Sequence, residues 1–90
     1  METAKKFLQF VLEEMVDYPD QVVIEVKQDE MGVLLVAKVA PTDMGKVIGR
    51  QGKTAEAIRE LLRVIGFKAH AKISFKLEEP EGREHPNENR

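Results

Sequence analysis

The sequence predicts one α+β domain in which a three-stranded sheet carries helices on one face, in the order α-β-β-α-α-β. Apolar residues recur at helical spacing in two stretches, and β-branched or apolar residues alternate with polar ones in the segments expected to be strands. A third observation is the turn Gly49-Arg50-Gln51-Gly52, which follows a short helical pattern and precedes a longer one. The chain has 90 residues, enough for one modest core, and we expect residues 1–77 to form that domain.

The first helix is expected over residues 4–18. Thr3 is a candidate N-cap, and the helix should end at Tyr18 because a residue before proline avoids the helical region. Polar side chains occupy one side of this segment. The other side is apolar and consists of Phe7, Leu8, Val11, Leu12, Met15 and Val16.

Two strands should follow, over residues 21–28 and 33–39, and pair as an antiparallel hairpin through the turn at 29–32. Val22, Ile24 and Val26 alternate with charged residues in the first of these strands. The second is apolar almost throughout, which favours a central place in the sheet.

The second half of the domain begins where residues 40–43 break the strand, with Thr42 or Asp43 as a candidate N-cap. A short helix from Met44 to Ile48 then leads into the glycine turn. A longer helix over residues 53–65 should end at Gly66. Its expected buried stripe consists of Ile58, Leu61, Leu62 and Ile65.

The chain should close with a third strand over residues 69–77, in which Ala71, Ile73, Phe75 and Leu77 alternate with polar residues. Residues 78–90 contain prolines and many charges but no apolar side chain, and we expect a disordered polar tail.

Composition excludes several classes of site. The absence of cysteine removes disulfides and thiolate metal sites. His70 and His85 are too far apart for a ligand pair and are expected at a strand edge and in the tail. No set of residues has the pattern of a catalytic site, so we expect no enzyme, no cofactor, no metal and no small-molecule substrate. No apolar run has the length of a membrane span and no signal peptide is evident, so a cytoplasmic protein is expected.

Positive charge is concentrated around the glycine turn although the whole chain carries a formal charge of −2. Residues 44–76 contain eight Lys or Arg and two Asp or Glu, a balance of +6. Residues 1–43 and 77–90 have balances of −5 and −3. Because the local field steers a polyanion, this distribution favours a nucleic-acid partner for the middle segment.

Three interpretations of Gly49-Arg50-Gln51-Gly52 compete. A P-loop requires a glycine five positions before the second glycine, where this chain has Val47, and a dinucleotide fingerprint fails because the glycines are at 45, 49 and 52. The second interpretation is a plain structural corner between two helices, which would explain the glycines without any ligand. A helix-turn-helix DNA reader is disfavoured by Glu56 and Glu60, which would repel phosphates. The third interpretation is a clamp for single-stranded nucleic acid.

The segment 47–53, followed by Ile58, resembles the core of the KH domain, whose Gly-x-x-Gly loop clamps about four nucleotides. The expected order of elements is similar to the type II, bacterial-style KH fold. Length and layout resemble the small bacterial KhpA (YlqC-type) RNA-binding proteins over about residues 3–77. Ala55 stands where the family usually has a branched apolar residue, which alters the expected groove floor and not the fold.

The resemblance implies that the loop contacts phosphates and that bases lie between the two motif helices and the second strand. For Ile48 and Ile58 a core position is at least as strong an expectation as a groove position. Few exposed aromatics are expected to stack on bases, so a single site should bind weakly. The expected RNA-binding residues are Lys46, Val47, Ile48, Gly49, Arg50, Gln51, Gly52, Lys53, Thr54, Ile58, Val36 and Lys38.

The expected partner is single-stranded RNA, and the resemblance implies RNA chaperoning or post-transcriptional regulation. It also implies a homodimer, a heterodimer with a larger Jag-type KH protein, and a link to cell shape and cell wall organisation. Ala57 and Val64 lie off the expected core stripe and are candidates for a partner surface. The alternative function is a protein-interaction module that uses the KH fold to dock a partner.

Overall fold

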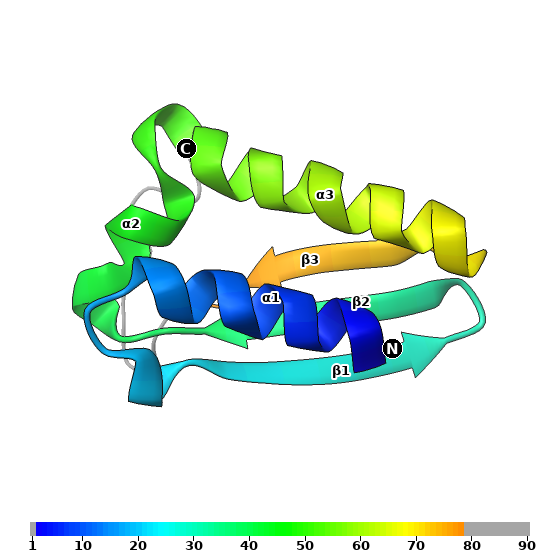
Figure 1. The fold of residues 1–90 in the computed structure, drawn as a ribbon, viewed down its shortest axis with the longest axis horizontal. Coiled ribbons are helices and arrows are strands. Elements are labelled where there is room, and N and C mark those ends of the chain that lie inside the picture. Colours follow the sequence, from blue (N-terminus) through cyan, green and yellow to red (C-terminus); the bar gives the residue numbers. More distant parts are fainter. Residues whose placement is uncertain (1, 79–90) are drawn as a thin grey trace, which may run out of the picture.

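The computed structural model describes residues 2–78, and its elements follow the predicted order (Figure 1). Short 3₁₀ turns precede β1, precede α2 and separate α2 from α3. The fold is therefore α+β with three helices and one three-stranded sheet, as the sequence predicts. The bounds are α1 Glu2–Met15, β1 Val23–Asp29, β2 Gly32–Lys38, α2 Met44–Ile48, α3 Lys53–Ala69 and β3 Ile73–Leu77.

The sheet has the order β1-β2-β3, with β2 antiparallel to β1 and parallel to β3. The predicted hairpin and the predicted central strand are both confirmed. Cross-strand pairing places Ile24, Ala37 and Leu77 in one row and Val26, Leu35 and Phe75 in the next. The residues between these two rows have their side chains on the opposite face of the sheet.

The core lies between one face of the sheet and the helices α1 and α3, which run side by side over it (Figure 1). Each helix contributes residues three or four apart, so that a single stripe is buried. On α1 these are Ala4, Leu8 and Leu12, and on α3 they are Ile58, Leu62 and Gly66. The strands complete the core with Val33, Leu35, Ala37, Ile73 and Phe75 among others.

The boundaries of the first helix and of the strands differ from the predictions. The helix begins at Glu2, so Thr3 lies inside it and is not its cap, and it ends at Met15. The chain turns through residues 16–22, with a 3₁₀ turn over Pro19–Gln21, before β1 begins at Val23. In β1 and β2 the predicted ends shift by one or two residues.

The end of α3 is a larger correction. Gly66 does not end the helix, which continues to Ala69, and His70 caps it in the left-handed conformation with φ 59°. A Cβ at position 66 would lie 2.5 Å from the carbonyl oxygen of Ala71. Glycine is therefore required by close packing inside the helix, and His70 is a helix cap and not a strand-edge residue. Leu61, expected in the buried stripe, is 50% exposed.

The third strand begins at Ile73, later than predicted, and its alternation is as expected. The Glu78 N–H donates to the carbonyl oxygen of Ala37 at 2.8 Å, which extends the pairing by one residue. The rest of the expected tail, with His85, lies outside the described residues.

Asp43 is fully buried and is not the side-chain cap that the sequence predicts. Its two carboxylate oxygens each accept one backbone N–H, from Asp17 and from Tyr18, both at 3.1 Å. The carboxylate thus joins the segment after α1 to the start of α2. This link fixes where the chain enters the glycine turn.

Candidate nucleic-acid interface

The glycine turn is a tight connection between α2 and α3 at one end of the molecule, opposite the β1–β2 hairpin (Figure 1). Gly49 ends α2 with φ 78° and ψ 173°, and its N–H donates to the Gly45 carbonyl oxygen at 2.9 Å. Gln51 and Gly52 follow with φ 57° and 77°. Three of the four residues therefore have positive φ, a conformation that an ordinary side chain disfavours by about 1–2 kcal/mol.

Gly49 is further constrained by its neighbour across the turn. A Cβ at this position would collide with the side chain of Thr54, whose Oγ1 and Cβ are the nearest atoms. A Cβ on Gly52 would meet nothing within 4 Å. The close approach of Gly49 to Thr54 folds the loop back on the first turn of α3, so its backbone lies beside the positive end of the α3 dipole.

The side chains of the predicted loop residues divide into exposed and buried groups. Arg50, Gln51 and Lys53 are exposed at the loop and at the start of α3. Val47 is fully buried and Ile58 is 3% exposed, so both belong to the core and support the turn from below. Ile48, 37% exposed, is the apolar residue beside the loop that is available to a ligand.

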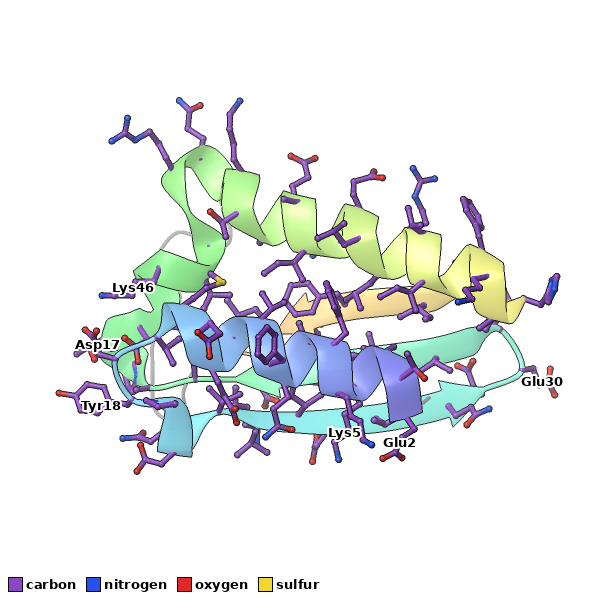
Figure 2. All side chains as sticks on the ribbon, in the orientation of Figure 1. Glu2, Lys5, Asp17, Tyr18, Glu30 and Lys46 are labelled. Atoms are coloured by element: carbon purple, nitrogen blue, oxygen red, sulfur yellow. The ribbon has the colours of Figure 1, made fainter. Side chains whose placement is uncertain are left out.

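The cations of this region are not equally free. Lys46 Nζ lies 3.3 Å from Asp17 Oδ2, and the two residues meet at the same end of the molecule (Figure 2). Arg63 pairs with Glu60 on the outer side of α3. Neither Arg50 nor Lys53 forms an ion pair within residues 2–78. The loop therefore carries two positive charges that are not committed to any described carboxylate.

The strand that borders α3 is β3 and not β2. Val36 and Lys38 alternate with the core residues Leu35 and Ala37 and therefore point to the sheet face away from the helices. Lys38 also lies 4.0 Å from the Glu78 carboxylate. The structure does not bring these two predicted residues together with the loop.

Within residues 2–78, no strand pairs with the outer edge of β3, the strand that lies beside α3. The Lys72 carbonyl oxygen and the Glu78 N–H bond to β2, so by alternation Ile73, Phe75 and Leu77 direct their backbone groups to the other edge. An α3 residue, Arg59, donates to the Phe75 carbonyl oxygen at 3.2 Å, and its guanidinium lies 5.6 Å from the Phe75 ring centre.

The sequence alone assigns no role to Arg59. Its spacing one residue after the core position Ile58 is a signal that it flanks the core stripe, but only the fold shows that β3 lies beside it. Arg59 ties α3 to the β3 edge and adds a cation along the line that leads away from the loop. Its guanidinium has further N–H groups beyond the one that binds Phe75.

The part of the chain that the structure describes has neither a metal-binding cluster nor a membrane-spanning helix. Within residues 2–78, no three Asp, Glu or His side chains come together in a way that would hold a metal ion. Among the described helices, none combines the length and the apolar character needed to cross a membrane.

The chain matches the family model for the KH domain of KhpA and KhpB over residues 5–77. Curated proteins named RNA-binding protein KhpA are similar to it along nearly their whole length. That of Clostridium acetobutylicum is 39% identical over 69 residues, covering 77% of this chain and 92% of the relative. That of Chlamydia caviae is 35% identical over 75 residues, covering 83% and 96%. The matched region contains all the described helices and strands except the first residues of α1.

Proposed function

Because the chain belongs to the KhpA/KhpB family of KH domains, we propose that it binds single-stranded RNA through the Gly49–Gly52 loop. The observation that carries the proposal is the loop itself, where two exposed cations that form no ion pair within residues 2–78 lie on a glycine turn at the start of α3. The names of the relatives describe RNA binding. The proposal is for a binding protein and not for an enzyme.

In this proposal Arg50 and Lys53 contact phosphate oxygens, and Gln51 donates a further hydrogen bond from the loop tip. These contacts position the strand and carry little sequence information. Bases then lie against Ile48 and along the line between α3 and the outer edge of β3, where the backbone groups of Ile73 and Leu77 have no strand partner within residues 2–78. Val36 and Lys38 have no part in this path, because they lie on the other face of the sheet.

The proposed site is small and should bind weakly by itself. The aromatic side chain near the path, Phe75, is 4% exposed and is not available for stacking on a base. Stacking on an exposed aromatic contributes about 1–3 kcal/mol per base in other single-strand readers. A dissociation constant in the micromolar range is expected for one domain, and a second copy would raise the effective affinity.

We further propose that two copies associate through the outer surface of α3. An outer α3 patch is formed by residues spaced three or four apart, Ala57, Leu61, Val64 and Phe67. The last three are 50%, 59% and 67% exposed. The helix has acidic residues, Glu56 and Glu60, near its beginning and basic ones, Arg63 and Lys68, near its end. An antiparallel pair of α3 helices would therefore place opposite charges together around this patch.

The wider role belongs to the same proposal. RNA chaperoning or post-transcriptional regulation in the cytoplasm, a Jag-type KH partner and a link to cell shape all follow from the family resemblance. A homodimer and a heterodimer would use the same α3 patch, so the two assemblies would compete for it.

The experiment that tests RNA binding is a filter-binding titration with a short unstructured RNA at two salt concentrations. A phosphate clamp gives saturable binding whose affinity falls as salt rises, by a logarithmic slope of about 0.7 per phosphate contact on a single strand. The alternative function, a protein-docking module, predicts no saturable salt-dependent binding.

A further inference from the structure

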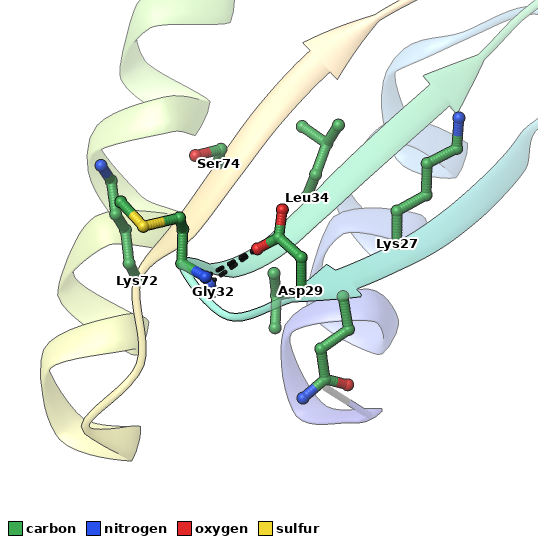
Figure 3. Close-up of a pocket in the computed structure, with 9 residues that line it drawn as sticks. Lys27, Asp29, Gly32, Leu34, Lys72 and Ser74 are labelled. Atoms are coloured by element: carbon green, nitrogen blue, oxygen red, sulfur yellow. Dashed lines mark hydrogen bonds between the residues drawn. The ribbon is translucent and has the colours of Figure 1, made fainter.

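A second concave site lies far from the glycine loop, at the hairpin end of the sheet. It is an open pocket with a volume of about 310 Å³. Gly32 is one of its lining residues, and a Cβ at this position would collide with the Lys72 carbonyl oxygen. Figure 3 shows Lys27 and Lys72 on its two sides with Leu34 and Ser74 between them. The side chains that line it and bear on the argument are Lys27, Asp29, Met31, Leu34, Lys72 and Ser74.

Strand register shows which face of the sheet carries this pocket. Leu34 pairs with Lys27 on one side and with Ser74 on the other, so the three form one row across the sheet. The neighbouring residue Val33 is buried in the core beneath the helices. By alternation, the row containing Leu34 points to the face that no helix covers.

The lining combines an apolar floor with positive and hydrogen-bonding walls. Leu34 is half-buried, and the side chain of Met31, 72% exposed, offers a flexible apolar surface beside it. Lys27 and Lys72 form no ion pair with any residue between 2 and 78. Ser74 adds a hydroxyl that can donate or accept.

The carboxylate of Asp29 borders the pocket, and one of its two oxygens is already bonded to the backbone of the turn. Asp29 Oδ1 accepts the N–H of Met31 at 2.8 Å and the N–H of Gly32 at 3.1 Å (Figure 3). These bonds tie the carboxylate to the hairpin and leave Oδ2 as an acceptor. Two cations against one carboxylate give the pocket a net positive charge, and Oδ2 can receive a hydrogen bond from an amino or hydroxyl group.

This mixture is suited to a nucleotide, which has an anionic phosphate, an apolar base face and donors on the base and ribose. We propose that the pocket is a second nucleotide subsite, occupied by a part of the same RNA strand that leaves the loop. A base lies on Leu34 and Met31 in the middle of the pocket, and Lys27 and Lys72 contact phosphates of the strand from its two sides. This inference rests on the proposed RNA binding.

The path between the two sites is continuous in the fold. The C-terminal end of α3 and the start of β3 both lie at the hairpin end (Figure 1). An RNA strand that follows α3 and the outer edge of β3 away from the loop therefore reaches Lys72, where it passes round the edge of the sheet to the pocket on the other face. The loop accommodates about four nucleotides, so a longer RNA is needed to reach the second subsite.

The test compares four-nucleotide and eight-nucleotide unstructured RNAs by fluorescence anisotropy, using the full chain and a Lys27→Ala/Lys72→Ala variant. We expect the variant to bind the four-mer within twofold of wild type and the eight-mer about tenfold more weakly. A Lys5→Ala/Lys6→Ala variant removes the same charge from α1 and should change neither affinity by more than about twofold. Equal loss of eight-mer affinity in the two variants would overturn the subsite and show only a general charge effect.

Amide resonances supply a second measurement that does not depend on variants. The eight-mer should shift the backbone signals of Gly32, Leu34 and Ser74, whereas the four-mer should leave them in place. Eight-mer binding with no shift at these residues overturns the subsite and leaves the proposed function intact. If wild-type protein binds neither RNA, the proposed function itself fails.

Discussion

The buried carboxylate of Asp43 gives the sharpest prediction for stability. Replacing it with alanine leaves the N–H groups of Asp17 and Tyr18 without their acceptor. A hydrogen bond to a charged group contributes about 1.5–3 kcal/mol. The two bonds together predict a loss of about 3–6 kcal/mol in the free energy of unfolding. A domain of this size has a stability near the lower end of the usual 5–15 kcal/mol, so a large fraction would be lost.

Replacing Asp43 with asparagine keeps the shape of the side chain but removes its negative charge. Asp43→Asn keeps one acceptor oxygen, but its amide group faces the other N–H, and we expect a loss of about 2 kcal/mol. The matched control is Asp20→Ala, which removes an exposed carboxylate and should change stability by less than about 0.5 kcal/mol. Urea unfolding followed by circular dichroism measures all three. A loss below about 1 kcal/mol in Asp43→Ala would refute the role assigned to this carboxylate.

Three further predictions concern the loop and its surroundings. Gly49→Ala should destabilise the fold by more than about 2 kcal/mol because its Cβ would collide with Thr54, whereas Gly52→Ala should destabilise it by only about 1 kcal/mol. Urea unfolding measures both variants, and equal losses of stability would contradict the loop geometry. Asp17→Ala should free Lys46 from its ion pair, which strengthens RNA binding about twofold at low salt and changes stability by less than about 1 kcal/mol. An unchanged RNA affinity would show that Lys46 does not face the RNA. Leu61→Glu on the outer α3 patch should abolish self-association in sedimentation experiments and leave the unfolding midpoint of the monomer nearly unchanged. If this variant still dimerises, the interface lies elsewhere.

The sequence was sufficient for the order of elements and for the strand at the centre of the sheet. Helical periodicity in α1 and α3 and the apolar run of β2 are local signals that the structure confirms. The end of α3 was not predictable in this way. Gly66 has the pattern of a helix terminus, but its lack of a side chain serves contact with the chain at Ala71, which only tertiary packing reveals.

The residues of the candidate site that are adjacent in sequence were predictable. Those whose place depends on the order of strands in the sheet were not. The loop and its cations lie together because they are adjacent in sequence. The sequence predicts Val36 in the groove because it does not show which strand borders α3, and alternation places this side chain on the other face of the sheet. Asp43 matches the pattern of a helix cap, but its partners are residues 17 and 18, which no local rule brings near. Arg59 was missed for the same reason.

The proposed function depends on the Gly49–Gly52 loop as the contact between this protein and single-stranded RNA. The most direct measurement is the affinity of an Arg50→Asp/Gln51→Asp variant for a short unstructured RNA, compared with wild type. A Lys6→Asp/Gln21→Asp variant makes the same change of charge at exposed positions away from the loop. We predict that the loop variant keeps its circular dichroism spectrum and loses RNA binding by more than about tenfold, whereas the control binds within about threefold of wild type. An unchanged affinity in the loop variant would show that the Gly49–Gly52 loop is not the RNA contact.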